Sequence, residues 1–196
     1  MPKVSDSHQE ARRRQILDAA ARCFARRGFA VTTVREIYEE AGLSAGSVYV
    51  YFRGKDEIVE ALVHEQIGQM AARAGILDHV EDPAEALGMV IRGFAAAADA
   101  APREQLSLRL QSWAASTTTT QFAAVFREAF ESVHTPLARA LERAGAADPD
   151  ALARVVMAAL QGLVLQVVHE TGVDTAAYAE TLVVAVQSAL PARAQP

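Results

Sequence analysis

The chain has 196 residues, 51% of them hydrophobic and only 6% aromatic, which is typical of an alanine-rich helical protein. Its single cysteine, Cys23, excludes an intramolecular disulfide framework and is best explained as a small apolar core residue. No uninterrupted apolar run reaches the ~18 residues of a membrane span, and the N-terminus lacks the apolar segment of a signal peptide. We therefore expect a soluble, cytoplasmic protein without a membrane partner.

Charge divides the chain into a basic first part and an acidic remainder. Residues 1–55 hold ten lysines and arginines against six aspartates and glutamates, whereas residues 56–196 hold nine against eighteen. A basic segment suits a module that binds a polyanion, while DNA would repel the acidic remainder. For each arginine of the run 12–14 taken singly, a solvated charge at a helix start is an equally good explanation.

The first predicted helix spans residues 8–27, because apolar side chains recur there at helical spacing and Gly28 can end it. A short helix over 34–40 follows. Thr33 and Glu36 are spaced as a capping box at its start, in which each side chain bonds the backbone N–H of the other residue.

A glycine turn leads into the third predicted helix. Gly42 supplies the backbone freedom of a sharp turn, and Ser44 is placed to cap a helix over 45–51. Val48 and Phe52 would face inward from it. Two short helices around such a turn are typical of a helix-turn-helix motif, whose second helix reads DNA.

The helix over 45–51 begins with small residues that allow close approach to DNA, and it ends near two tyrosine hydroxyls that can reach phosphate oxygens. We expect base contacts from Arg35, Ala45, Gly46 and Ser47, and phosphate contacts from Thr33, Tyr49, Tyr51 and Lys55. The predicted DNA-binding residues are Thr33, Arg35, Ser44, Ala45, Gly46, Ser47, Tyr49, Val50, Tyr51 and Lys55.

These residues also carry a family resemblance. The chain reads T-T-x-x-E-I from Thr32 and A-G-x-S-x-G-x-x-Y-x-Y-F-x-x-K from Ala41. This pattern closely resembles the DNA-binding domain of TetR-type transcriptional regulators. The resemblance covers residues 10–69, about the first third of the chain, and many positions agree in order and spacing.

Two positions depart from the family pattern. Val50 stands where the family often has His or Tyr; a valine can touch a thymine methyl group but cannot hydrogen-bond a phosphate. Gly54 replaces the usual Ser before Lys55 and is a weaker cap for the next helix. Each departure changes a local contact and leaves the rest of the pattern intact.

Further helices are predicted by their start signals. A long helix begins near Lys55 and would link the DNA-binding part to the rest of the chain. Asp82 followed by Pro83 opens a helix that runs to about residue 100, and Pro102 starts another.

Thr118 and Gln121 are spaced as a capping box for a helix that reaches residue 143, and Pro136 should kink that helix. Asp148 opens the next helix and Asp174 the last.

The count is nine helices, as the resemblance also implies. We expect an all-α fold with a helix-turn-helix DNA-binding domain over 8–54 and a regulatory, ligand-binding and dimerisation domain over 55–196.

The helix after Asp148 is apolar over more of its circumference than packing on one neighbour needs. Two such helices from each of two subunits would form a four-helix bundle. A central helix within one subunit is the alternative, but a lone helix-turn-helix usually needs a second copy to read a pair of half-sites. The predicted dimer interface consists of Leu152, Val156, Leu160, Leu163, Val164, Val167, Leu182 and Val186.

The region after residue 55 shows no catalytic or metal-binding pattern, so we expect no enzyme, no metal site and no cofactor. It offers apolar volume with few polar groups, which suits a small apolar ligand. Core packing explains any one of these residues better, so the pocket follows mainly from the resemblance. The predicted pocket residues are Met89, Phe94, Leu110, Trp113, Phe122, Phe126, His134, Met157 and Gln161.

The resemblance implies a homodimer that binds a palindromic double-stranded DNA operator and leaves it when a small hydrophobic effector occupies the body. A tilt of the helix that begins at Lys55 would move the two reading helices out of register with major grooves ~34–36 Å apart. Activation instead of repression stays open. The alternatives from other classes are an architectural or scaffold DNA-binding protein without a ligand and, more remotely, a helical enzyme.

Overall fold

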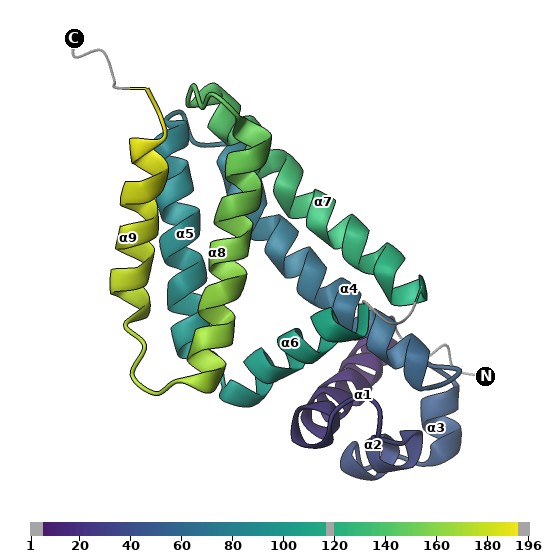
Figure 1. Ribbon diagram of the computed structural model, residues 1–196. Helices are drawn as coiled ribbons and strands as arrows, with labels where there is room; N and C mark the ends of the chain where they lie inside the picture. Colours follow the sequence, from purple (N-terminus) through teal and green to yellow (C-terminus); the bar gives the residue numbers. More distant parts are fainter. Residues whose placement is uncertain (1–5, 117–119, 192–196) are drawn as a thin grey trace. The chain divides into compact units, whose positions relative to one another are not determined.

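The computed structural model describes residues 6–116 and 120–191, apart from the side chains of a few helical residues, Phe122 among them. Every regular element in these ranges is a helix (Figure 1). The α-helices are α1 (Asp6–Arg27), α2 (Val34–Glu40), α3 (Ala45–Tyr49), α4 (Lys55–Ala74), α5 (Pro83–Ala100), α6 (Arg103–Ser116), α7 (Thr120–Arg143), α8 (Pro149–His169) and α9 (Thr175–Ser188), and a 3-10 helix, η1 (Gly75–Asp78), follows α4. The predicted all-α fold and nine α-helices are confirmed for the described residues.

Capping by aspartate explains three of the helix starts in the later part of the chain. Asp82, Asp148 and Asp174 each accept a hydrogen bond from a backbone N–H in the first turn of the helix that follows, at 2.9–3.3 Å. In α5 and α8 a proline comes next, where its missing N–H costs no helical hydrogen bond. These starts agree with the prediction.

Some boundaries differ from the prediction. Helix α1 begins at Asp6 instead of residue 8, and α3 ends at Tyr49 instead of residue 51. The chain leaves α3 early because the N–H of Tyr51 donates to the carbonyl oxygen of Val48, which tightens the last turn. The 3-10 helix η1 was not predicted, since a single turn has no hydrophobic period of its own.

Pro136 lies inside α7, which continues to Arg143, and its predicted kink stays a prediction. The predicted capping box at the start of this helix involves Thr118 and the Gln121 side chain, which lie outside the described residues.

Contacts divide the chain into two compact units. Unit 1 is Met1–Gln66 with Ser107–Val125, and unit 2 is Ile67–Leu106 with Phe126–Pro196. The division between the units therefore falls inside α4, α6 and α7. The predicted boundary at residues 54 and 55 divides the chain by function, and it stays a prediction.

The core of unit 1 is built on α1. Ile16, Ala20 and Phe24 lie at successive turns of one side of this helix and are fully buried. Helix α2 packs against α1 and also contacts α3. Ile37 of α2 and Val48 of α3 are fully buried as well. These contacts fix the two short helices, which would not be stable alone.

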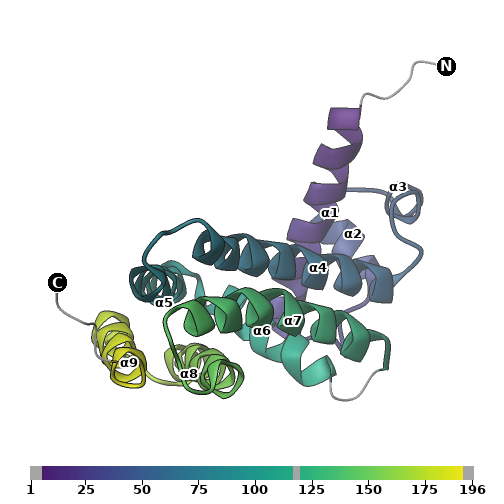
Figure 2. The ribbon, with the colours of Figure 1, turned by 90° about the horizontal axis from the view of Figure 1, so that it is seen from above.

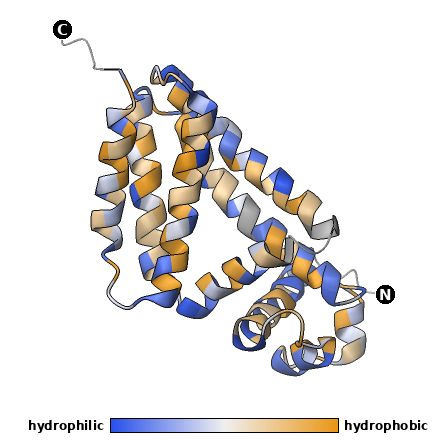
Figure 3. Cartoon of the chain, viewed as in Figure 1, coloured by the Kyte–Doolittle hydropathy of each residue, from blue (hydrophilic) through white to orange (hydrophobic). Residues whose placement is uncertain are grey.

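In unit 2, α5 packs against both α8 and α9, and the three helices lie side by side in both ribbon views (Figures 1 and 2). Long apolar segments run along them (Figure 3). Burial of each large apolar side chain contributes about 1.5–3 kcal/mol before entropic costs. The fully or almost fully buried side chains of this core include Leu77, Leu87, Ile91, Leu141, Leu163 and Val156.

By length and composition alone, α8 could cross a membrane. Seven of its side chains are nevertheless buried, five of them in the hydrophobic core cluster of unit 2. Because core helices of soluble proteins meet the same two criteria, the feature is weak evidence for a membrane span.

Candidate nucleic-acid interface

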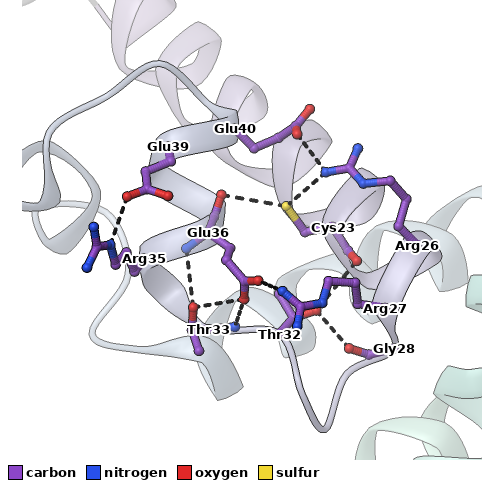
Figure 4. Close-up of polar contacts among 10 residues, drawn as sticks. All are labelled: Cys23, Arg26, Arg27, Gly28, Thr32, Thr33, Arg35, Glu36, Glu39 and Glu40. Carbon is purple, nitrogen blue, oxygen red and sulfur yellow. Dashed lines mark hydrogen bonds and ion pairs between the residues drawn. The ribbon is translucent and has the colours of Figure 1, made fainter.

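The start of α2 is held by the capping box expected from the sequence. Thr33 Oγ1 accepts from the N–H of Glu36 at 3.3 Å, and the N–H of Thr33 donates to Glu36 Oε2 at 2.8 Å (Figure 4). The hydroxyl of Thr33 also donates to that carboxylate, at 2.9 Å. Arg27, in the last turn of α1, pairs with the other oxygen of Glu36. Glu36 therefore helps to cap the start of α2 and links this helix to α1.

The far end of α2 is tied to α1 through Glu40. Arg22 Nε lies 2.7 Å from Glu40 Oε1, and Arg26 donates to Oε2 at 2.6 Å. These hydrogen bonds, that of Arg22 first, lower the pKa of the Glu40 carboxyl. Between the two helices lies Cys23, buried as the sequence predicted, and burial raises the pKa of its thiol.

The arginine run in α1 makes contacts within the protein. Arg12 donates to Gln15 at 2.8 Å, Arg13 lies over the ring of Phe52 at 5.2 Å, and Arg14 pairs with Glu65. Other arginines of α1 bind α2. Many of the basic side chains in the first 55 residues therefore make contacts within the protein.

The turn between α2 and α3 uses the predicted glycine and serine. Gly42 has φ +65°, a left-handed conformation that favours glycine. Ser44 Oγ accepts from the N–H of Ser47 at 3.2 Å and lies 2.8 Å from the hydroxyl oxygen of Ser47. Gln15 of α1 donates to the carbonyl oxygen of Ala41 at 2.7 Å, which fixes the end of α2.

Helix α3 has a buried side and an exposed side. Val48 and Phe52 point into the core of unit 1, whereas Gly46, Tyr49 and Val50 are exposed. A Cβ atom added at Gly46 would meet nothing within 4 Å. The exposed side therefore offers an open backbone position beside two large side chains, as a helix that enters a DNA groove requires.

All ten predicted DNA-binding residues belong to unit 1, and none is buried. Arg35 pairs with Glu39 one turn later, Nε to Oε1, at 2.8 Å (Figure 4). Lys55 also makes hydrogen bonds within the protein. Its ammonium group donates to the carbonyl oxygens of Phe29 and Ala30 at 2.8 and 3.2 Å. This contact was not predicted, because Lys55 is separated along the chain by 26 positions from Phe29 and by 25 from Ala30.

The predicted pocket residues are spread over both units. Leu110 and Trp113 belong to unit 1, where the Trp113 side chain is 56% exposed. Between them in α6, the buried Oε1 atom of Gln111 has no hydrogen-bond partner among the described residues. The Phe122 side chain lies outside the described residues.

The other six predicted pocket residues belong to unit 2. Met157 is buried in the core of unit 2, and the partly buried Phe94 packs against this core. Met89 and Gln161 are exposed. Phe126 is partly buried.

His134 of α7 is buried and bound to α8. Its Nε2 lies 3.2 Å from Asp150 Oδ1, and its ring stacks on Phe130 at 5.3 Å between centroids. This position holds α7 against the start of α8.

Two hollows in unit 2 are lined by other residues, and none of the nine predicted pocket residues contributes to them. The first, of about 830 Å³, lies at the start of α5 and has Arg92, Arg143 and Gln187 in its wall. The second, of about 530 Å³, lies beside α9 and is lined by Gln166, Val173, Asp174, Ala177, Tyr178, Thr181, Leu182 and Ala185. Sequence reasoning did not single out these hollows as pockets, because each wall combines residues from separate segments.

The predicted dimer interface includes many core residues of unit 2. Val156, Leu160, Leu163, Val164 and Val186 are buried within the subunit, and Leu152, Val167 and Leu182 are partly buried against the same core. The large apolar side chains that α8 and α9 expose are instead Val155, Leu165 and Val184, at 59%, 49% and 59%.

Within the described ranges, no group of three or more His, Cys, Asp or Glu side chains could hold a metal ion.

Comparisons with known proteins match both parts of the chain. Residues 16–62 match the family described as bacterial regulatory proteins, tetR family, and residues 83–191 match the C-terminal domain of BetI-type transcriptional repressors. The HTH-type transcriptional repressor Rv1474c of Mycobacterium tuberculosis is 46% identical over 85 residues, which cover 42% of this chain and 46% of that protein. The chain thus matches about half the length of this relative.

Solved structures share the fold. SmeT, the repressor of the Stenotrophomonas maltophilia multidrug efflux pump SmeDEF, is similar with a TM-score of 0.71 and 26% identity, covering 91% of this chain and 89% of that one. FadR of Bacillus subtilis, solved in complex with stearoyl-CoA, is similar with a TM-score of 0.76 and 20% identity, covering 91% and 99%. At that identity, the likeness to FadR shows the fold alone.

Proposed function

The chain belongs to the TetR family of bacterial regulatory proteins, and we propose that it is a homodimeric transcriptional repressor that a small molecule releases from its DNA operator. Regulators of this family bind operators and small-molecule effectors, typically as dimers. The proposal assigns it no catalytic role.

The exposed side of α3 is the observation that carries the DNA-binding part of the proposal. The buried Val48 anchors α3 in the core of unit 1, and Gln15 of α1 fixes the end of α2 just before the turn into α3, while Gly46, Tyr49 and Val50 remain exposed. A helix that is anchored by its buried side and exposed on the other side can place side chains on the base edges of DNA. Tyr49, Tyr51, Thr33 and Lys55 are the proposed phosphate contacts.

Repression is favoured over activation by the similar proteins, because both Rv1474c and SmeT are named repressors. A repressor does its work by occupying its operator and must be removed from it when its genes are needed. A hydrophobic effector is proposed on one ground, the long acyl chain of the ligand in the FadR structure. Helix α4, which belongs to both units, is the proposed link between effector and DNA.

Dimerisation through α8 and α9 is supported by the exposed residues of these helices. On α8 the exposed or half-exposed residues Ala151, Val155, Ala158, Gly162 and Leu165 follow one another at spacings of four and three, the repeat of a helix seam. A second copy would cover this stripe together with Val184 of α9. A two-fold dimer reads two-fold related half-sites, so a palindromic operator is proposed as well. The cytoplasm, where the chromosome is accessible, is the proposed location.

A paired measurement tests the function. A thermal-shift screen of metabolites and drugs with the full chain finds compounds that stabilise it, and each hit is then added to the protein on fluorescent operator DNA. We expect a compound that raises the melting temperature and releases DNA over the same concentration range. Stable DNA binding that no stabilising compound weakens would favour the scaffold alternative.

A further inference from the structure

The most exposed large apolar side chain in the described part of the protein is Val50. Its side chain is 79% exposed, more than any other in that group. It caps the C-terminal end of α3, directly after Tyr49. Folding does not require an apolar residue here, since Val48 and Phe52 supply the buried contacts of this segment. An exposed valine at this position therefore needs another explanation.

The polar groups of α3 are largely occupied by its own cap. The hydroxyl groups of Ser44 and Ser47 lie 2.8 Å apart, and Ser44 also accepts from the N–H of Ser47. No charged residue occurs between Glu40 and Arg53. Apart from the exposed Tyr49, which is assigned to a phosphate, the outer side of this segment offers the apolar surface of Val50 beside the bare backbone of Gly46, four residues earlier and so on the same side.

The major groove presents one apolar group to such a surface, the C5-methyl group of thymine. Most other groups on the base edges there are hydrogen-bond donors or acceptors, which a valine cannot satisfy. The open space at Gly46 lets the α3 backbone approach the base edges, so that the two methyl groups of Val50 can meet this thymine methyl.

We propose that Val50 is a specificity-determining residue that selects a thymine in each operator half-site by packing on its C5-methyl group. This inference rests on the proposed function, because it takes α3 to be the DNA-reading helix. Burial of one methyl group corresponds to about a fourfold change in affinity.

Deoxyuridine provides the test, because it pairs like thymine and lacks only the methyl group. The full-length protein is first used to select its preferred duplex from a random pool. Each thymine of that duplex is then replaced in turn by deoxyuridine, and the affinities of wild type and Val50→Ala are measured. Wild type should lose about fourfold at one thymine per half-site. Val50→Ala should bind the thymine and deoxyuridine duplexes equally.

Val31→Ala is the matched control, since Val31 is also an exposed valine of unit 1 but lies outside α3. This variant should keep the wild-type sensitivity to the methyl group. Wild-type affinity that is indifferent to deoxyuridine at every position would overturn the assignment, as would a Val50→Ala protein that still discriminates. If the chain selects and binds no duplex at all, the proposed function fails together with the inference.

Discussion

The ammonium nitrogen of Lys55 donates a hydrogen bond to the carbonyl oxygen of Phe29, 2.8 Å away. A second bond goes to Ala30, so the first residue of α4 is tied to the loop between α1 and α2. An ammonium group has three donors, and one remains for a DNA phosphate. Lys55 thus has an observed role in the fold beside its predicted role in binding.

The two roles of Lys55 are separable by mutation. Lys55→Ala should lower the free energy of unfolding by about 1–2 kcal/mol, since two carbonyls lose a charged donor. It should also reduce the slope of log affinity against log salt by about one unit, as expected for one lost phosphate contact. Arg73→Ala, which removes a basic charge from the other end of α4, should change neither. An unchanged salt slope with reduced stability would leave Lys55 only its structural role.

Gly46→Ala should strengthen the fold and weaken DNA binding. The new Cβ meets nothing in the free protein, and alanine is favoured over glycine in a helix by about 0.5–1 kcal/mol. On DNA, the same methyl group would keep the α3 backbone from the base edges. Thermal denaturation and DNA titration measure the two effects. Gly93→Ala in α5 is the control, because an added Cβ at Gly93 also meets nothing within 4 Å, and this variant should only gain stability. Equal DNA affinity of the two variants would show that Gly46 does not lie in the DNA interface.

Acid should weaken the attachment of α2 to α1. Hydrogen bonds from Arg22 and Arg26 lower the pKa of Glu40 in the folded protein, so the stabilisation is fully present above the unfolded value of about 4.3. It is lost as the pH falls through the lower folded value. The stability difference between wild type and Glu40→Gln should therefore be largest near neutral pH and shrink below about pH 4.3. Denaturant unfolding from pH 7 to 3 measures it, with Glu170→Gln as a charge control; a pH-independent difference would contradict the linkage.

If the exposed stripe of α8 forms the dimer interface, glutamate should have different effects at an exposed and at a buried valine of this helix. Val155→Glu places a carboxylate on the exposed stripe and should give well-folded monomers in light scattering, with reduced operator affinity. Val164→Glu buries an unpaired carboxylate in the core of the subunit and should destabilise the fold itself by several kcal/mol. Circular dichroism separates the two outcomes. A Val155→Glu protein that remains dimeric would place the interface elsewhere.

Local chemistry was the part of this structure that the sequence predicted well. The capping box of Thr33 and Glu36, the left-handed Gly42 and the cap of Ser44 each depend on residues within a few positions, and all are found as expected. The orientation of α8 was harder to predict. Because apolar residues surround most of this helix, the sequence could not tell the buried Val156 from the exposed Val155.

Long-range contacts explain the remaining differences. The partner of His134 is Asp150, and only the packing of α7 on α8 brings them together, whereas the pocket role of His134 stays a prediction. The pairing of Lys55 with the α1–α2 loop is of the same kind. Such contacts have no sequence period and follow from tertiary structure alone.

Reading of a specific DNA operator by a two-fold dimer can be tested by selecting duplexes from a random pool with the purified full-length protein and sequencing them. We expect one enriched motif with two inverted half-sites whose centres lie about 34–36 Å, or a multiple of this distance, apart. A pool that remains unenriched after repeated selection, or enrichment of a single half-site by a monomer, would contradict it.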